Sequence, residues 1–113
     1  MNKRSMWALA AMAAGGLITA VSAASEWEIG QSGKRFMMNG SKVETLVIKA
    51  GDAVRFRNED PYFHNIFSLS ETKLFDLGSF PKGDSRSMVF DKVGVVDLEC
   101  AIHPEMQLKL EVR

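Results

Sequence analysis

The segment 93–112 holds the pattern that most restricts the fold of this chain. Two runs in which apolar and polar residues alternate, 93–100 and 107–112, flank a short polar segment. Alternation with a period of two is typical of a β-strand with one buried face. Cys100 shares the inward parity of Val96 and Leu98, and Met106 shares that of Leu108. The pattern therefore predicts two strands whose joining turn brings Cys100 and Met106 back to one place.

The rest of the chain after residue 24 has the same character. Short runs of β-forming residues are separated by Gly, Asp, Asn and Pro, and no long helical periodicity interrupts them. Six to eight such runs predict an all-β sandwich of two sheets. The segment 75–82 is interpreted as a loop that covers one side. The expected strands are residues 26–29, 35–38, 44–49, 53–58, 65–69, 86–90, 93–100 and 107–112.

Residues 1–24 have the composition of a signal peptide. Lys3 and Arg4 give a basic start, and residues 6–21 are apolar and rich in alanine. The small residues of 21–23 or of 22–24 suit a signal peptidase. The alternative is an uncleaved membrane anchor, but the apolar run is short for a membrane-spanning helix. We expect cleavage, a single exported domain over 25–113, and no stable insertion in a membrane.

Charge and cysteine content narrow the possible functions. Without Lys3 and Arg4, the 14 basic residues fall to 12 against 14 acidic ones, which argues against nucleic acid as a partner. One cysteine cannot form an internal disulfide. Because small exported domains often need extra stabilisation, a bound metal would serve here.

The candidate metal ligands are Cys100, His103, Met106 and, far upstream, His64. They include the only cysteine and the only two histidines of the chain. Taken singly, each has an ordinary interpretation: a buried core cysteine, a surface histidine, a methionine packed in the core. Together they form the His₂Cys set with a weak axial methionine that typifies a blue-copper electron-transfer site. The set therefore predicts one copper ion per chain.

At these residues the chain resembles the cupredoxins, the small blue-copper proteins. The resemblance includes residues 50–58, the approach from Asp60 to His64, and the strand that leads into Cys100. Two residues separate Cys100 from His103, and two separate His103 from Met106, a spacing similar to that of the amicyanin group.

The resemblance implies a cupredoxin-like Greek-key sandwich of about eight strands with a type 1 copper site. His64, Cys100 and His103 would be the strong ligands and Met106 the axial one. It also implies a periplasmic carrier of single electrons, expected to be a monomer. Its partners would be redox proteins: a c-type cytochrome, a dehydrogenase or an oxidase.

Two residues near the ligands carry further expectations. The resemblance implies that Asn65 ties the two ligand segments together and that its N–H bonds the Cys100 sulfur. Ile102 stands where the amicyanin group has proline, and Glu105 stands where that group has an aromatic residue. Because Ile102 keeps an N–H that proline lacks, a second N–H bond to the sulfur is predicted.

Three classes of function remain open at this point. The first is an electron shuttle, and the second is a copper-binding or storage protein without a redox partner. The third is an enzyme, which we do not expect. A Cys-His hydrolase needs an oriented base and an open pocket, whereas here four side chains converge. A multicopper oxidase needs many more than two histidines.

Overall fold

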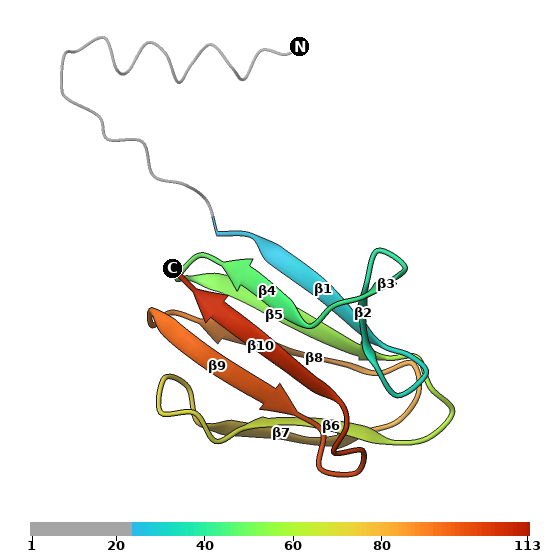
Figure 1. Ribbon diagram of the computed structural model, residues 1–113. Helices are drawn as coiled ribbons and strands as arrows, with labels where there is room; N and C mark the ends of the chain where they lie inside the picture. The colour runs from blue at the N-terminus through green and yellow to red at the C-terminus, as the bar shows by residue number, and fades with distance from the viewer. Residues whose placement is uncertain (1–23) are drawn as a thin grey trace, which may run out of the picture.

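The computed structural model describes residues 24–113, which fold as two β-sheets packed face to face (Figure 1). Except for Ala24, the predicted leader lies outside the described residues. Within them, no helix is long and apolar enough to cross a membrane. The strands are β1 (Glu26–Gln31), β2 (Phe36–Met38), β3 (Ser41–Lys42), β4 (Thr45–Ile48), β5 (Asp52–Asn58), β6 (His64–Ser68), β7 (Phe75–Phe80), β8 (Ser85–Phe90), β9 (Gly94–Glu99) and β10 (Gln107–Val112).

Each sheet contains five strands. One has the order β3-β2-β1-β5-β8 and the other β4-β10-β9-β6-β7. The pairs β1–β5 and β4–β10 are parallel, and the other neighbours are antiparallel. The predicted all-β sandwich is confirmed. The two strands beyond the expected eight are the two-residue β3 and β7.

Strand β7 corrects the interpretation of 75–82 as a loop. It pairs with β6 at the edge of the sheet, with Asn65 opposite Ser79 and Phe67 opposite Asp76. β7 therefore carries one extra residue between these pairs, which makes a bulge. Gly78 lies in this bulge with φ of +75°, a conformation that glycine adopts without steric cost. The bulge breaks the alternation, so the sequence lacks a regular strand pattern there.

The core lies between the sheets and is built from their inward faces. In β5 every second residue is buried, and in β9 and β10 the predicted parity is confirmed. Asp97 on β9 faces outward, and Cys100 follows the strand as a fully buried residue. The largest side chains of the core are Phe36, Phe56, Phe80, Phe90, Ile29, Ile48, Ile66, Leu98, Met106, Leu108 and Leu110.

The two ends of the sandwich differ in what they hold. At one end His64 pairs with Phe80, and the Asn58 side chain also bonds the Phe80 carbonyl. At the opposite end β5 begins with Asp52, which pairs with Phe90. The chain enters the first sheet there, since Glu26 lies opposite Ala53. All ten strands therefore follow Ser25 in the sequence.

Two adjacent valines of β9 test this arrangement with one type of substitution. Val96 is 0% exposed and Val95 is 41% exposed. Val96→Ala should lower the free energy of unfolding by about 2 kcal/mol, through lost burial and the cavity left behind. Val95→Ala should change it by less than about 0.5 kcal/mol, as at an exposed position. Urea unfolding of both variants measures the difference, and equal losses would contradict the assigned faces.

Candidate metal centre

The segment between β9 and β10 folds as two consecutive turns that hold His103 between Cys100 and Met106. The His103 N–H donates to the Cys100 carbonyl at 3.2 Å, and the Met106 N–H donates to the His103 carbonyl at 2.9 Å. Cys100 is fully buried at the end of β9, whereas His103 is half-buried on the turn. The turns therefore direct the thiol and the imidazole of one short segment to the same side.

His64 reaches the same place from another strand of the same sheet. It is the first residue of β6 and is fully buried. β6 pairs with β9 further along, where Phe67 lies opposite Glu99. The beginning of β6 therefore extends past the end of β9 and lies beside the turn that follows β9. This register, and not proximity in sequence, brings His64 to Cys100.

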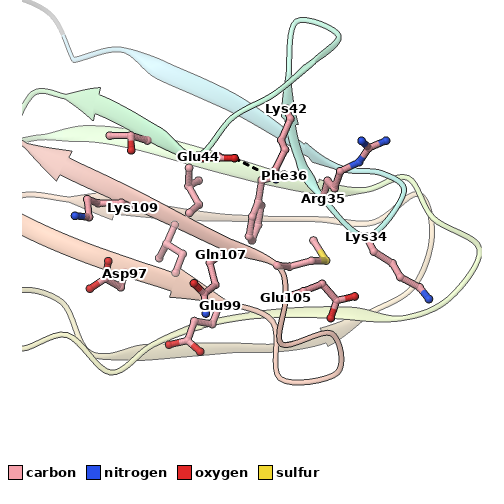
Figure 2. Close-up of a pocket in the computed structure, with 14 residues that line it drawn as sticks. Lys34, Arg35, Phe36, Lys42, Glu44, Asp97, Glu99, Glu105, Gln107 and Lys109 are labelled. Carbon is pink, nitrogen blue, oxygen red and sulfur yellow. Dashed lines mark ion pairs between the residues drawn. The ribbon is translucent and has the colours of Figure 1, made fainter.

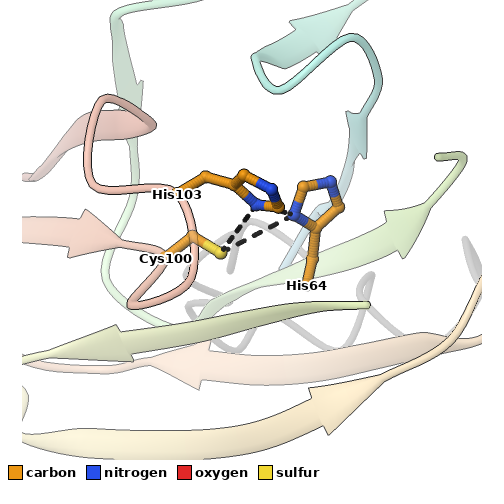
Figure 3. Close-up of side chains that lie close together, drawn as sticks. All are labelled: His64, Cys100 and His103. Atoms are coloured by element: carbon orange, nitrogen blue, oxygen red, sulfur yellow. Dashed lines mark hydrogen bonds between the residues drawn. The ribbon is translucent and has the colours of Figure 1, made fainter. Parts of the chain in front are cut away.

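Three donor atoms form a triangle at this end of the sandwich (Figure 3). Cys100 Sγ lies 3.6 Å from His64 Nδ1 and 3.9 Å from His103 Nδ1, and the two nitrogens are 3.2 Å apart. A metal in the plane of such donors, with bonds typical of zinc, requires separations of about 3.8 Å between sulfur and nitrogen and about 3.5 Å between nitrogens. The cluster therefore fits one metal ion closely.

Asp60 leaves the His64 Nδ1 atom free to bind a metal. Its carboxylate lies 2.7 Å from His64 Nε2 and requires the proton on that nitrogen, so that Nδ1 presents a lone pair to the cluster. Burial raises the pKa of Asp60, but the hydrogen bond from His64 and those from the N–H groups of Lys34 and Gly33 outweigh it. The pKa of Asp60 thus lies below its usual value.

Asp60 is itself held in place by hydrogen bonds to the β1–β2 turn and to β5. The N–H groups of Gly33 and Lys34 donate to its carboxylate at 2.7 and 3.1 Å. Its own N–H donates to the Asn58 side chain at 2.8 Å. Sequence reasoning missed the roles of Asp60 and Asn58. A carboxylate four residues before a candidate ligand was the available signal, but such spacing is common.

Tyr62 covers the two imidazoles. Its ring centroid lies 5.4 Å from that of His64 and 5.1 Å from that of His103. Burial raises the pKa of Tyr62, and the nearby Asp60 carboxylate raises it further. Tyr62 is therefore a neutral phenol at neutral pH, and its ring packs against both histidine rings.

Asn65 joins the two segments that carry the cluster, as the resemblance implied. Its N–H points at Cys100 Sγ with a nitrogen–sulfur distance of 3.5 Å, and its side-chain oxygen accepts the Ala101 N–H at 2.7 Å. The prediction of a second donor is wrong. Among the described residues, Asn65 is the backbone donor to this sulfur. Ile102 is the third residue of the Cys100–His103 turn, a position whose N–H takes no part in the turn's own hydrogen bond.

Met106 lies where its parity predicts, since it is 1% exposed and precedes β10. Beside it, a cleft of about 780 Å³ opens on the surface between β2–β3 and β9–β10 (Figure 2). Lys42 and Glu44 form an ion pair at its rim, at 3.1 Å. The cleft is lined by Lys34, Arg35, Phe36, Lys42, Glu44, Thr45, Asp97, Leu98, Glu99, Glu105, Met106, Gln107, Leu108 and Lys109, and so by none of the three cluster residues.

The Asn65 bridge makes a prediction about stability. Asn65→Ala leaves the Ala101 N–H without its acceptor, and we expect a loss of about 1–3 kcal/mol in the free energy of unfolding. Hydrogen exchange at the Ala101 amide should become faster. The control is Gln107→Ala, which removes an exposed amide just after the turn. If Asn65→Ala costs no more than this control, the bridge does not hold the two segments together.

No protein-family model matches the chain, and no curated protein sequence matches it. The fold, however, is similar to solved structures of amicyanin. A reduced tryptophan-to-tyrosine variant of amicyanin has a TM-score of 0.69 and 21% identity, covering 81% of this chain and 86% of the other. A methionine-to-alanine variant in the Cu(I) form has a TM-score of 0.68 and 20% identity, covering 78% and 82%. An oxidised proline-to-alanine variant of amicyanin has a TM-score of 0.68 and 21% identity, covering 78% of this chain and 82% of the other.

Similarity at this level of identity establishes the architecture of the chain. The site rests on this chain's own residues, His64, Cys100 and His103, which converge at one end of the sandwich. The chain therefore has the cupredoxin fold found in amicyanin, and its His-Cys-His cluster fits that of a blue-copper protein.

Proposed function

We propose that this protein transfers single electrons between redox proteins through one type 1 copper ion. His64, Cys100 and His103 are the strong ligands, and Met106 is the weak axial ligand. The observation that carries the proposal is the triangle of Cys100 Sγ and two Nδ1 atoms, with sides of 3.2 to 3.9 Å, on this fold. The solved amicyanin structures of the same fold include a Cu(I) form.

Copper supplies one-electron chemistry, and one thiolate with two imidazoles suits both of its oxidation states. The chain's part is to hold these donors still. The buried His64 is fixed through Asp60, and Cys100 is fixed through Asn65. The Asn65 N–H also withdraws charge from the sulfur, which favours the reduced state. Donors that move little between the two states lower the reorganisation that accompanies each electron.

Electrons would pass between the copper and a partner protein through the half-buried His103. Exposed residues surround it on two segments that the Tyr62–His103 contact brings together. Phe63 is 53% exposed and Ile102 is 49% exposed, and Pro104 is also exposed. A c-type cytochrome, a dehydrogenase or an oxidase could dock on this apolar rim and exchange electrons without a substrate pocket. The protein itself would then be a carrier and not an enzyme.

The proposed location is the periplasm, because residues 1–24 have the composition of a signal peptide. An oxidising compartment suits the cluster, since the lone buried Cys100 has no cysteine partner with which to form an internal disulfide. The mature chain, 25–113, would then act as a soluble monomer.

Colour is the first test of this function. The copper-loaded protein should be intensely blue when oxidised, with one copper per chain, and should be bleached and recovered by one-electron reduction and reoxidation. Cys100→Ser should abolish the band, because the thiolate causes it, whereas Ala101→Ser on the same exposed turn should keep it. A blue Cys100→Ser protein would refute the ligand set. Copper that binds but cannot be cycled would favour storage.

The axial role of Met106 is tested by the reduction potential. Met106→Gln offers a stronger oxygen donor to Cu(II), so the potential should fall while the protein stays coloured. Met37→Gln is the control, since Met37 lies on β2 and belongs neither to the cluster nor to the lining of the cleft beside Met106. Voltammetry on both variants gives the comparison. Equal potentials for Met106→Gln and the unmodified protein would remove Met106 from the coordination sphere.

A further inference from the structure

A buried carboxylate lies at the end of the sandwich opposite to the metal cluster. Asp52, the first residue of β5, is 2% exposed. Its Oδ1 accepts the Ser25 N–H at 2.8 Å, and its Oδ2 accepts the Trp27 indole N–H and the Lys49 N–H, each at 3.0 Å. Asp52 therefore links Ser25, β1 and the β4–β5 turn.

The charge of Asp52 is not balanced by a direct ion pair. The backbone N–H of Ser25, the Trp27 indole and the Lys49 N–H lower its pKa against the effect of burial, so the carboxylate is ionised at neutral pH. Among residues 24–113, the ion pairs involve other carboxylates. A buried charge normally has an opposite charge close by. The three donors are neutral, and the charged side chain of Lys49 has the smallest effect on this pKa and makes no ion pair with Asp52, so the requirement is incompletely met.

Ser25 is the residue at which the sandwich begins. Its carbonyl accepts the Ala53 N–H at 3.0 Å, while its N–H is held by Asp52. Both backbone groups are thus fixed, although the residue itself is exposed, as is Ala24. The β1–β5 ladder starts directly after it, with Glu26 opposite Ala53.

The sequence before Ser25 allows two processing sites. The small residues of 21–23 would direct cleavage between Ala23 and Ala24, and those of 22–24 would direct it between Ala24 and Ser25. We propose that the Ala24–Ser25 bond is the one hydrolysed, and that the new α-ammonium of Ser25 is the counter-charge of Asp52. This inference rests on the proposed export of the chain.

Hydrolysis changes the Ser25 nitrogen in a defined way. Water adds across the peptide bond, and Ala24 departs with the leader as a carboxylate. The Ser25 nitrogen becomes an amine and takes up a proton. One N–H of the ammonium keeps the bond to Asp52 Oδ1, and the others reach solvent. The neutral bond thereby becomes a charge-assisted one, which is about twice as strong. Cleavage after Ala23 would instead leave a neutral amide at Asp52, with the ammonium about 3.8 Å further along the chain.

The first experiment identifies the new terminus. The full-length chain is expressed in a bacterium that exports it, and the intact mass of the recovered protein is measured. A chain that begins at Ser25 supports the proposal. A chain that begins at Ala24 overturns the assigned bond but leaves export standing. A chain that retains its leader overturns both, while the copper chemistry of the cluster stays a separate question.

The second experiment tests the counter-charge itself. Because all ten strands follow Ser25, proteins that begin at Ser25 and at Ala23 contain the same sandwich. Acetylation of the terminal amine should lower the melting temperature of the Ser25 protein by about 4 °C or more. It should leave the Ala23 protein unchanged, since its amine belongs to a residue two positions before Ser25 and the Ser25 nitrogen stays a neutral amide. Acetylation that has no effect on the Ser25 protein overturns the ion pair.

The third experiment substitutes the Asp52 carboxylate and compares melting temperatures. Asp52→Asn should lower the melting temperature more in the Ser25 protein than in the Ala23 protein, because only the former loses an ion pair. Glu26→Gln, which neutralises the exposed carboxylate next to Ser25, is the matched control and should affect both proteins alike. Equal losses on Asp52→Asn in the two proteins contradict the proposal. If Asp52→Asn does not fold, the acetylation result decides alone.

Discussion

The site depends on the bond between Asn65 and the residues around the Cys100 sulfur. His64 belongs to β6, whereas Cys100 and His103 follow β9, and 36 positions separate the first two. Strand pairing sets how far along the sheet His64 and Cys100 lie. It does not set the orientation of the turn that follows β9. Asn65 supplies that constraint with two bonds, one to the sulfur and one from the Ala101 N–H. Two adjacent residues thus have different roles. His64 supplies a donor atom to the cluster, and Asn65 positions the segment that contains Cys100 and Ala101.

Two buried carboxylates organise the two ends of the sandwich. Asp60 accepts hydrogen bonds from the Gly33 and Lys34 N–H groups and orients His64. Asp52 accepts hydrogen bonds from the N–H groups of Ser25 and Lys49 and from the Trp27 indole. Each one ties β1 or its flanking turn to β5 or to the segment that follows it. The β1–β5 pair, which lies in the interior of the first sheet, is thereby fixed by side chains at both of its ends. The β1–β2 turn is thereby connected, through one carboxylate, to a candidate copper ligand.

The sequence predicted those features that depend on strand parity. The burial of Cys100 and Met106 followed from alternation in β9 and β10, and six further candidate strands were placed without knowledge of the sheet order. Strand β7 was missed because the bulge at Gly78 disrupts the period of two. The contact of Asp60 with His64 could not be derived, since it depends on how the 59–63 segment turns. The Ile102 prediction failed for a related reason, because the direction of an N–H within a turn is set by local dihedral angles.

The pairing of β10 with both β9 and β4 has a consequence for the order in which the protein forms. β10 is the last of the ten strands in the sequence, yet it lies second in its sheet and pairs with β4, about 64 positions earlier. During synthesis from the N-terminus, that sheet stays incomplete until Gln107–Val112 has been added to the chain. Cys100 and His103 precede this strand by only a few residues. The three-donor cluster therefore forms late in folding, because the turn that carries Cys100 and His103 joins β9 to the strand that completes the sheet.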